Sequence, residues 1–371
     1  MLIGLLSWLL VMPAIAQQDI AIAIHPSVEL LGLAYFIGYE GADIENKTME
    51  VDGREIPKKE FHTFGYQVYQ EYHTYLASPH LAEAFQIADH LWLDQILGLL
   101  LRVDPVPNAG VSEELDPAYY LAFSKAKDPV EARELARRFL SAFNAFYREV
   151  AFDQFMEKYQ PHYTRALQEV STHLPRGPVV QWMETYFKKS FTGYALIPSL
   201  TLPKTMAFGL GNGQDTIYNI FGALDQQVIE DPGNLIMGFQ NSQKLRELTI
   251  HEFGHSFVNP VVYTLPDSLF GQSASLFEPI RATINEQGYN TWEACVIEHF
   301  VRAVELVLSE HYDTPEAYQK LRKVYIEDRQ FIYIPHLRPA LDRVLRGDLT
   351  FEEAVPQAMH ELVKQSKSEE E

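Results

Sequence analysis

The spacing of apolar and polar residues changes near residue 190 of this 371-residue chain. Residues 81–101 and 129–159 carry apolar residues at the three- and four-residue intervals that are typical of amphipathic helices. Residues 192–239 instead show short apolar runs between glycine-containing turns, a pattern that predicts short strands. Helical spacing returns after them. The pattern therefore predicts an α+β fold that is predominantly helical, with one small sheet in its second half.

The same change divides the chain into regions. Residues 17–190 are expected to form a mainly helical N-terminal region, and residues 191–365 a second region that contains the sheet. The final residues, 366–371, are all serine, lysine or glutamate. Because they offer nothing to a core, we expect a disordered tail there.

The first 16 residues are apolar and end in Ala14-Ile15-Ala16, the small-residue signature of signal-peptide cleavage. A membrane anchor is the alternative, but the run is shorter than the roughly 20 residues that a spanning helix needs. We therefore expect residues 1–16 to be a signal peptide that is cut after Ala16. The mature protein would be secreted or periplasmic, without stable membrane insertion.

Charge and cysteine content narrow the possible partners. The formal net charge of −20 disfavours nucleic acid and anionic membranes as binding partners. Cys295 is the only cysteine, so the chain cannot form an internal disulfide. We expect Cys295 to be a buried structural residue, which is the usual environment of a free cysteine. The alternative is a metal ligand, but a catalytic metal site keeps one position free of protein ligands.

One motif points to specific chemistry. Residues 251–255 read His-Glu-Phe-Gly-His, and Asn259-Pro260 follows as a helix stop signal. We therefore expect a helix over about 242–258. Residues four apart lie on one helical face, so His251 and His255 could bind one Zn²⁺ while Glu252 reaches a water beside it. The alternative is two structural histidines with a surface glutamate between them.

A catalytic zinc site normally has three protein ligands, so a third is required. A second helix, expected over about 291–310, carries Glu293, Glu298 and Glu305. Glu298 is favoured because its neighbours are apolar, and burial there would need compensation by a cation. Arg302, one turn further on, could orient its carboxylate. The alternatives are Glu293 as the ligand, or an exposed Glu298–Arg302 pair.

Three further side chains are candidates for contacting a substrate. His299 adjoins Glu298 and points about 100° away from it around the helix, so it could face a substrate or donate to an oxyanion. Tyr263 and Tyr289 lie at or near the ends of the segment between the two helices, and either could donate to a developing oxyanion. A core position for His299 is the alternative. The strands before residue 239 could supply a sheet edge to which an extended substrate pairs.

These motifs resemble those of known proteins. HEFGH followed by a glutamate on a later helix resembles the gluzincin type of zinc metallopeptidase. HEFGHSFVNP at 251–260 and EHFVRA at 298–303 resemble, more narrowly, a family of secreted bacterial proteins known only as a domain of unknown function. The resemblance implies a zincin-like core within 191–365, zinc ligands His251, His255 and Glu298, and Glu252 as the base.

The resemblance also leaves one role unassigned. Gluzincins carry an aspartate four residues after the glutamate ligand, where it orients a histidine, but this chain has Arg302 there. The sequence alone does not say which residue takes over this role.

The leading functional hypothesis is an exported zinc metallopeptidase acting on a peptide or protein substrate. Zinc would lower the pKa of a bound water to about 7, and Glu252 would act as general base. One alternative is a zinc-containing binding protein without catalysis, although a structural site has no need of Glu252. Another is a zinc hydrolase acting on a non-peptide amide or ester, which uses the same chemistry. Oligomeric state is not indicated.

Overall fold

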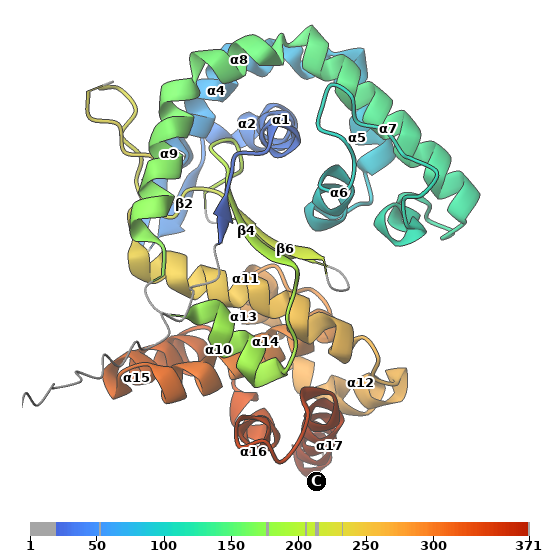
Figure 1. Ribbon diagram of the computed structural model, residues 1–371, viewed down its shortest axis with the longest axis vertical. Helices are drawn as coiled ribbons and strands as arrows, with labels where there is room; N and C mark the ends of the chain where they lie inside the picture. The colour runs from blue at the N-terminus through green and yellow to red at the C-terminus, as the bar shows by residue number, and fades with distance from the viewer. Residues whose placement is uncertain are drawn as a thin grey trace, which may run out of the picture.

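The small sheet lies in the middle of the molecule, with helices above and below it (Figure 1). The computed structural model describes residues 20–369 except 52, 176–177, 205, 212–214 and 232. Over these residues the fold is α+β and predominantly helical, which confirms the fold class expected from the sequence. The proposed signal peptide at 1–16 lies outside the described residues.

The helices of the first half are α1 (Pro26–Tyr35), α2 (Gly41–Ile44), α3 (Lys58–Phe61), α4 (Thr63–Tyr72), α5 (Pro79–Ala88), α6 (Leu93–Leu100), α7 (Pro129–Glu149), α8 (Phe152–Lys158), α9 (Gln160–His173) and α10 (Val179–Phe187). Most of them form an arc around α1 and the strands, but α10 lies below the sheet beside α11 (Figure 1). Shorter helical segments are η1 (Phe36–Glu40), η2 (His73–Ala77), η3 (Pro117–Tyr119) and η4 (Leu121–Phe123). A separate hairpin pairs β2 (Thr48–Val51) with β3 (Arg54–Pro57).

The longest helix of this half, α7, shows how local sequence sets these bounds. Asp128 caps its first turn by accepting from the backbone N–H groups of Val130 and Glu131, and Pro129 occupies the first helical position. Its buried face is made mainly of alanine and phenylalanine. Ala151, at φ 49°, then takes the left-handed conformation and turns the chain into α8.

The four-stranded sheet has the order β1-β4-β6-β5. Its strands are β1 (Ala21–Ile22), β4 (Gly193–Pro198), β5 (Ala207–Leu210) and β6 (Thr216–Phe221). β1, β4 and β6 are parallel, whereas β5 is antiparallel to β6 and forms one edge. β4 and β6 are almost wholly buried, in keeping with a sheet covered on both faces.

The helices of the second half lie below the sheet (Figure 1). They are α11 (Ser242–Val262), α12 (Asp267–Ser273), α13 (Arg281–Glu286), α14 (Trp292–Tyr312), α15 (Pro315–Lys323), α16 (Ile334–Leu345) and α17 (Phe351–Glu369), with η5 (Ala274–Phe277) and η6 (Val324–Asp328). α11 contacts β5 and β6 on one side and α14 on the other. It is therefore the layer between the sheet and the remaining helices.

Two helix ends differ from the sequence predictions. α11 does not stop before Pro260 but continues to Val262, because the Tyr263 N–H bonds the Asn259 carbonyl at 2.9 Å and closes the last turn around the proline. The predicted disordered tail at 366–371 is helical as far as Glu369. Ser366 is 1 % exposed and shares a hydrogen bond with Ser275, so this end of α17 is held by packing that the sequence does not reveal.

Within the described residues, no helix combines the length and the apolar character needed to cross a bilayer.

Candidate metal centre

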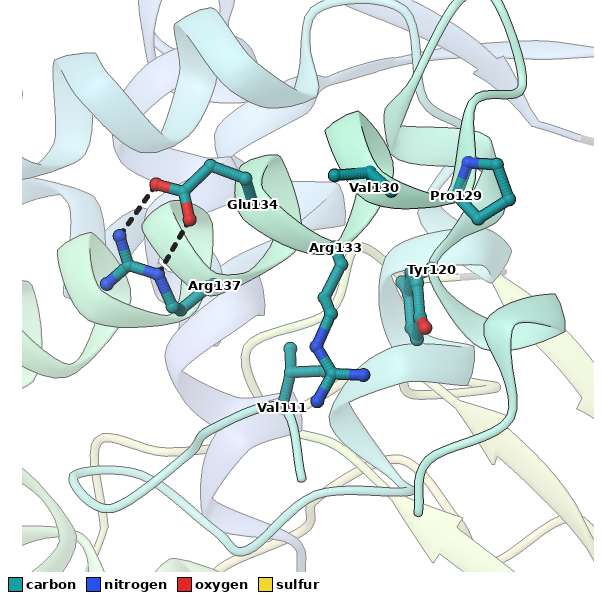
Figure 2. A pocket seen from close by; sticks show the side chains of 7 residues that line it. All are labelled: Val111, Tyr120, Pro129, Val130, Arg133, Glu134 and Arg137. Carbon is teal, nitrogen blue, oxygen red and sulfur yellow. Dashed lines mark hydrogen bonds and ion pairs between the residues drawn. The ribbon is translucent and has the colours of Figure 1, made fainter. Parts of the chain in front are cut away.

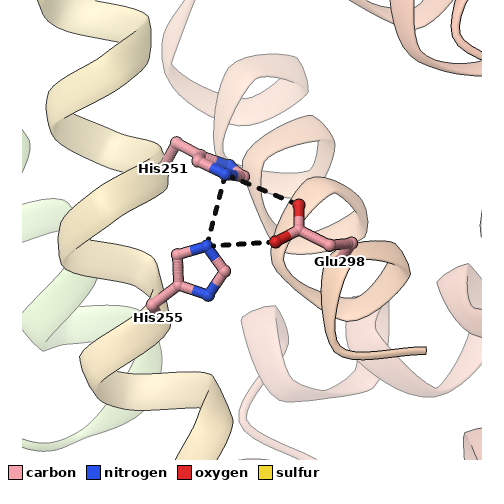
Figure 3. Close-up of side chains that lie close together, drawn as sticks. All are labelled: His251, His255 and Glu298. Atoms are coloured by element: carbon pink, nitrogen blue, oxygen red, sulfur yellow. Dashed lines mark hydrogen bonds and ion pairs between the residues drawn. The ribbon is translucent and has the colours of Figure 1, made fainter. Parts of the chain in front are cut away.

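Two neighbouring helices bring three potential metal ligands together (Figure 3). On α11, His251 and His255 are one turn apart, and their Nε2 atoms lie 3.3 Å from each other. On α14, Glu298 approaches both: Oε1 is 3.3 Å from His255 Nε2, and Oε2 is 3.6 Å from His251 Nε2. The sequence prediction that these three residues share one place is therefore met by the structure.

The separations fit a single bound metal ion. Two donors held about 2.0–2.1 Å from one metal at a tetrahedral angle lie about 3.4 Å apart. The Nε2–Nε2 separation and the separation of Oε1 from His255 Nε2, both 3.3 Å, are close to this value, and Oε2 lies 3.6 Å from His251 Nε2. Oε2 of Glu298 is buried without a well-aligned hydrogen bond, so the protein alone does not satisfy this carboxylate. The cluster could hold a metal ion.

The protonation states of His251 and Glu298 are those that a metal ion requires. Burial, reinforced by the charge of Arg302, lowers the pKa of His251 well below its ordinary value, so its imidazole is neutral. Burial alone would raise the pKa of Glu298, but Arg302 and the two histidines outweigh it and bring the pKa to about 2. Neutral imidazole and ionised carboxylate are the forms that bind metal ions.

Each histidine is oriented through its other ring nitrogen. Nδ1 of His251 lies 2.6 Å from Oε1 of Glu305, whose second oxygen accepts from the Tyr325 hydroxyl. Nδ1 of His255 lies 3.1 Å from Oδ1 of Asn259. A proton on each Nδ1, donated to these oxygens, would leave both Nε2 lone pairs on the side of Glu298.

These contacts identify the partner of His251 that the sequence left open. It is Glu305, seven residues after Glu298 on α14. Two turns of helix bring both glutamates to the same face of α14, which is a signal that the sequence did contain. The contact of Asn259 with His255 could not be predicted, because in the sequence Asn259 beside Pro260 indicates only the end of a helix.

Arg302 forms an ion pair with Glu298 inside the protein. Its Nη1 is 2.9 Å from Oε2 of Glu298, and the two residues are only 2 % and 5 % exposed. The alternative of an exposed surface pair is therefore wrong. Glu293, the alternative ligand, is exposed and lies outside the cluster.

Glu252 follows His251 on α11, where the helix backbone packs against the edge strand β5. It is 6 % exposed, and burial raises the pKa of its carboxyl to about 7. Its side chain makes no hydrogen bond or ion pair with the described residues. β5 runs against the helix backbone here: a Cβ placed on Gly209 would lie 1.9 Å from the Glu252 carbonyl oxygen. Only glycine permits this approach, and the expected edge strand lies beside the motif.

The other candidates occupy different surroundings. The Tyr289 hydroxyl accepts from Nη2 of Arg302 at 3.3 Å and also bonds Glu298, so it adjoins the cluster. His299 lies in the core: its Nδ1 is 2.8 Å from the Cys295 carbonyl, and its ring packs 5.0 Å from that of Phe331. The structure does not bring its ring nitrogens into the cluster.

Tyr263 and Cys295 are also separate from the cluster. Tyr263 is 70 % exposed at the end of α11, and no described contact joins it to the metal ligands. Cys295 is fully buried on α14, as expected for a structural residue.

On α6, desolvation by the surrounding protein raises the pKa of Asp94. A pocket of about 450 Å³ beside the start of α7 is a separate feature (Figure 2). None of its lining residues belongs to α11 or α14.

Fold and site together define a predominantly helical α+β protein with a buried His-His-Glu cluster able to hold a metal ion. Residues 107–346 match the family described as Domain of unknown function (DUF4932), and the chain belongs to this family. The match includes the whole of α11 and α14. Comparison with curated proteins gave no match, and neither did comparison with solved structures. The expectation of a domain of unknown function is therefore confirmed, and the family carries no statement of activity.

Proposed function

We propose that this protein is a zinc-dependent peptidase that cleaves peptide bonds with Glu252 as general base. One observation carries the proposal: two imidazole Nε2 atoms and a carboxylate oxygen converge at metal-binding distances beside a buried glutamate whose pKa is raised to about 7. A proton acceptor with a pKa near neutrality is efficient at both taking and returning a proton.

The donor set favours zinc among the common metal ions. Two imidazoles and one carboxylate occur in catalytic zinc sites, whereas magnesium and calcium prefer oxygen donors only. His251, His255 and Glu298 would hold the ion. Bound zinc supplies Lewis-acid chemistry, which activates water and polarises the scissile carbonyl.

The residues around the ion would divide the remaining work. Glu252 would hold a proton at its carboxylate during attack and then release it to the leaving amine. Tyr289, whose hydroxyl adjoins Glu298 and Arg302, would donate to the oxygen that gains negative charge. The edge of β5 would bind an extended peptide by backbone hydrogen bonds, which suits a peptide or protein substrate.

Two other functions use the same site. A hydrolase of a non-peptide amide or ester shares the chemistry and differs only in substrate. A binding protein with a structural zinc would not need a buried glutamate beside the ligands. Glu252 has no described structural partner, so its position favours catalysis.

The test is cleavage profiling of a diverse peptide library by mass spectrometry, with zinc-loaded mature protein. Glu252→Gln should keep stoichiometric zinc and lose about 10²–10⁴-fold in rate. Glu293→Gln, the same change at an exposed position of α14, is the matched control and should cleave normally. Equal cleavage by wild type and Glu252→Gln would overturn the mechanism. Zinc binding without any cleavage would favour a non-peptide substrate or a binding role.

Export is part of the same proposal. The apolar segment 1–16 and its Ala14-Ile15-Ala16 end support secretion or transfer to the periplasm. Sequencing the N-terminus of the protein recovered from the producing cells should give Gln17 as the first residue. An intact Met1 on exported protein would contradict cleavage after Ala16.

A further inference from the structure

Arg302 occupies an unusual position for an arginine. Its side chain is 2 % exposed, and it lies among the ligands of the proposed metal. Nη1 is 2.9 Å from Oε2 of Glu298 and 3.2 Å from Nε2 of His251. Nη2 donates to the Tyr289 hydroxyl at 3.3 Å. A permanent cation is therefore fixed beside a site that would itself bind a cation.

Aromatic rings hold the guanidinium in place. Its central carbon lies 4.5 Å from the ring centre of Phe331, 5.2 Å from that of Tyr325 and 6.0 Å from that of Tyr289. Cation–π contacts of this kind stabilise a desolvated arginine and restrict its rotation. The direction of its N–H groups is therefore set by packing as well as by Glu298.

The two oxygens of Glu298 have different surroundings. Oε1 lies 3.3 Å from Nε2 of His255. Oε2 is 3.6 Å from Nε2 of His251 but only 2.9 Å from Nη1 of Arg302. Its contact with Arg302 is an ion pair without the alignment of a full hydrogen bond. Oε1 therefore has His255 beside it, whereas Oε2 lies between His251 and Arg302 and is closer to the arginine.

We propose that Arg302 is a positioning residue that limits Glu298 to one metal-binding oxygen, Oε1. A glutamate can offer both oxygens to a metal, and doing so would occupy a coordination position that a catalytic site needs for water or substrate. Arg302 keeps Oε2 out of the coordination sphere and so keeps that position open. This inference rests on the proposed zinc function.

X-ray absorption of the zinc-loaded full-length mature protein tests this directly, because it counts the donors around zinc. Wild type should show four light-atom donors, three of them from the protein. Arg302→Met should gain one oxygen donor and lose at least about tenfold in peptide cleavage. Arg302→Lys keeps a cation that can reach Oε2, and its zinc should retain four donors.

Arg329→Met is the matched control. Arg329 packs on the same Phe331 ring, at 5.5 Å, but donates to Gln287 at 2.8 Å and not to Glu298. Removing it deletes a nearby charge without freeing Oε2, so the donor count should stay at four. A fifth donor in Arg329→Met would assign the effect to charge alone and overturn the inference.

Two results would refute the role of Arg302. One is an unchanged donor count in Arg302→Met. The other is a wild-type site that already binds zinc through both oxygens of Glu298, which is decisive even if Arg302→Met does not fold. Failure of the wild type to bind zinc would instead overturn the proposed function, so the two failures are distinguishable.

Discussion

Two of the buried glutamates, Glu169 and Glu298, have opposite surroundings. Glu169, on α9, is 2 % exposed and accepts from the backbone N–H groups of Met237 and Phe239, both at 3.0 Å. The amide of Gln240 and the guanidinium of Arg165 donate to it as well. Every group that approaches Glu169 is a donor, so the protein itself satisfies the carboxylate.

Glu298 has the opposite environment. It is 5 % exposed and lies 3.3 and 3.6 Å from ring nitrogens that present lone pairs. Only Arg302 and Tyr289 offer donors, and one oxygen has no well-aligned hydrogen bond. A buried carboxylate is costly unless it is compensated. The comparison separates a carboxylate that four hydrogen-bond donors satisfy from one that has an ion pair with Arg302 and two imidazole nitrogens beside it.

The largest expected effect is the loss of metal binding in Glu298→Gln. Removing the only charged ligand should weaken zinc binding by at least about 1,000-fold, or about 4 kcal/mol. Glu169→Gln should leave zinc affinity unchanged, because that carboxylate faces only donors. Competition with a chelator of known affinity measures both. Equal zinc affinity in wild type and Glu298→Gln would remove the distinction between the two glutamates.

The second effect concerns pH and the metal-free protein. Burial raises the pKa of Glu252 to about 7 from an ordinary 4.5, so the folded state binds this proton more tightly than the unfolded chain. Protonated Glu252 therefore adds to the stability of the fold, relative to the unfolded chain. This stabilisation is complete below pH 4.5 and is lost as the pH rises through about 7.

Between these pH values the free energy of unfolding of wild type should fall by about 3 kcal/mol relative to Glu252→Gln. Urea unfolding at a series of pH values, with chelator present, measures the difference. Parallel pH profiles of the two proteins would show that Glu252 is not desolvated. The lowered pKa of Glu298, about 2, acts in the separate window between pH 2 and 4.5.

The sequence predicted the mainly helical α+β fold class and three residues that the structure brings together, but not the contacts between them. The HExxH spacing alone places His251 and His255 on one helical face, and an apolar neighbourhood identified Glu298, because both arguments use only local geometry. The contact between Glu298 and the histidines could not be derived, since it depends on how α14 crosses α11. The partners of Glu305 and of Ser366 are likewise set by tertiary packing, which local patterns do not encode.

The third effect is structural. Glu169→Gln should lower the free energy of unfolding by about 2–3 kcal/mol, because an amide cannot accept from both backbone N–H groups and the arginine as a carboxylate does. These two backbone groups belong to the segment before α11, so the loss should be one of fold stability and not of zinc affinity. Urea unfolding measures it, with Glu293→Gln as the control for the same change at an exposed position. Destabilisation of both variants to the same extent would deny Glu169 a special role.

The smallest effects should come from the partners of the histidines, and they should differ from each other. Glu305 is 4 % exposed, lies 2.6 Å from Nδ1 of His251 and also receives the Tyr325 hydroxyl. Glu305→Gln should therefore weaken zinc binding by about 10–100-fold. Asn259→Ala removes a longer, neutral contact of 3.1 Å to His255 and should cost at most about tenfold.

The same chelator competition ranks the two variants, and circular dichroism confirms that each is folded. If Asn259→Ala weakened zinc binding more than Glu305→Gln, the charged partner of His251 would not be the one that orients the site. The ranking matters because Glu305 is a buried carboxylate, whereas Asn259 is neutral. A larger effect at Glu305 would mean that a carboxylate two turns beyond Glu298 on α14 orients His251, with Arg302 placed between the two glutamates.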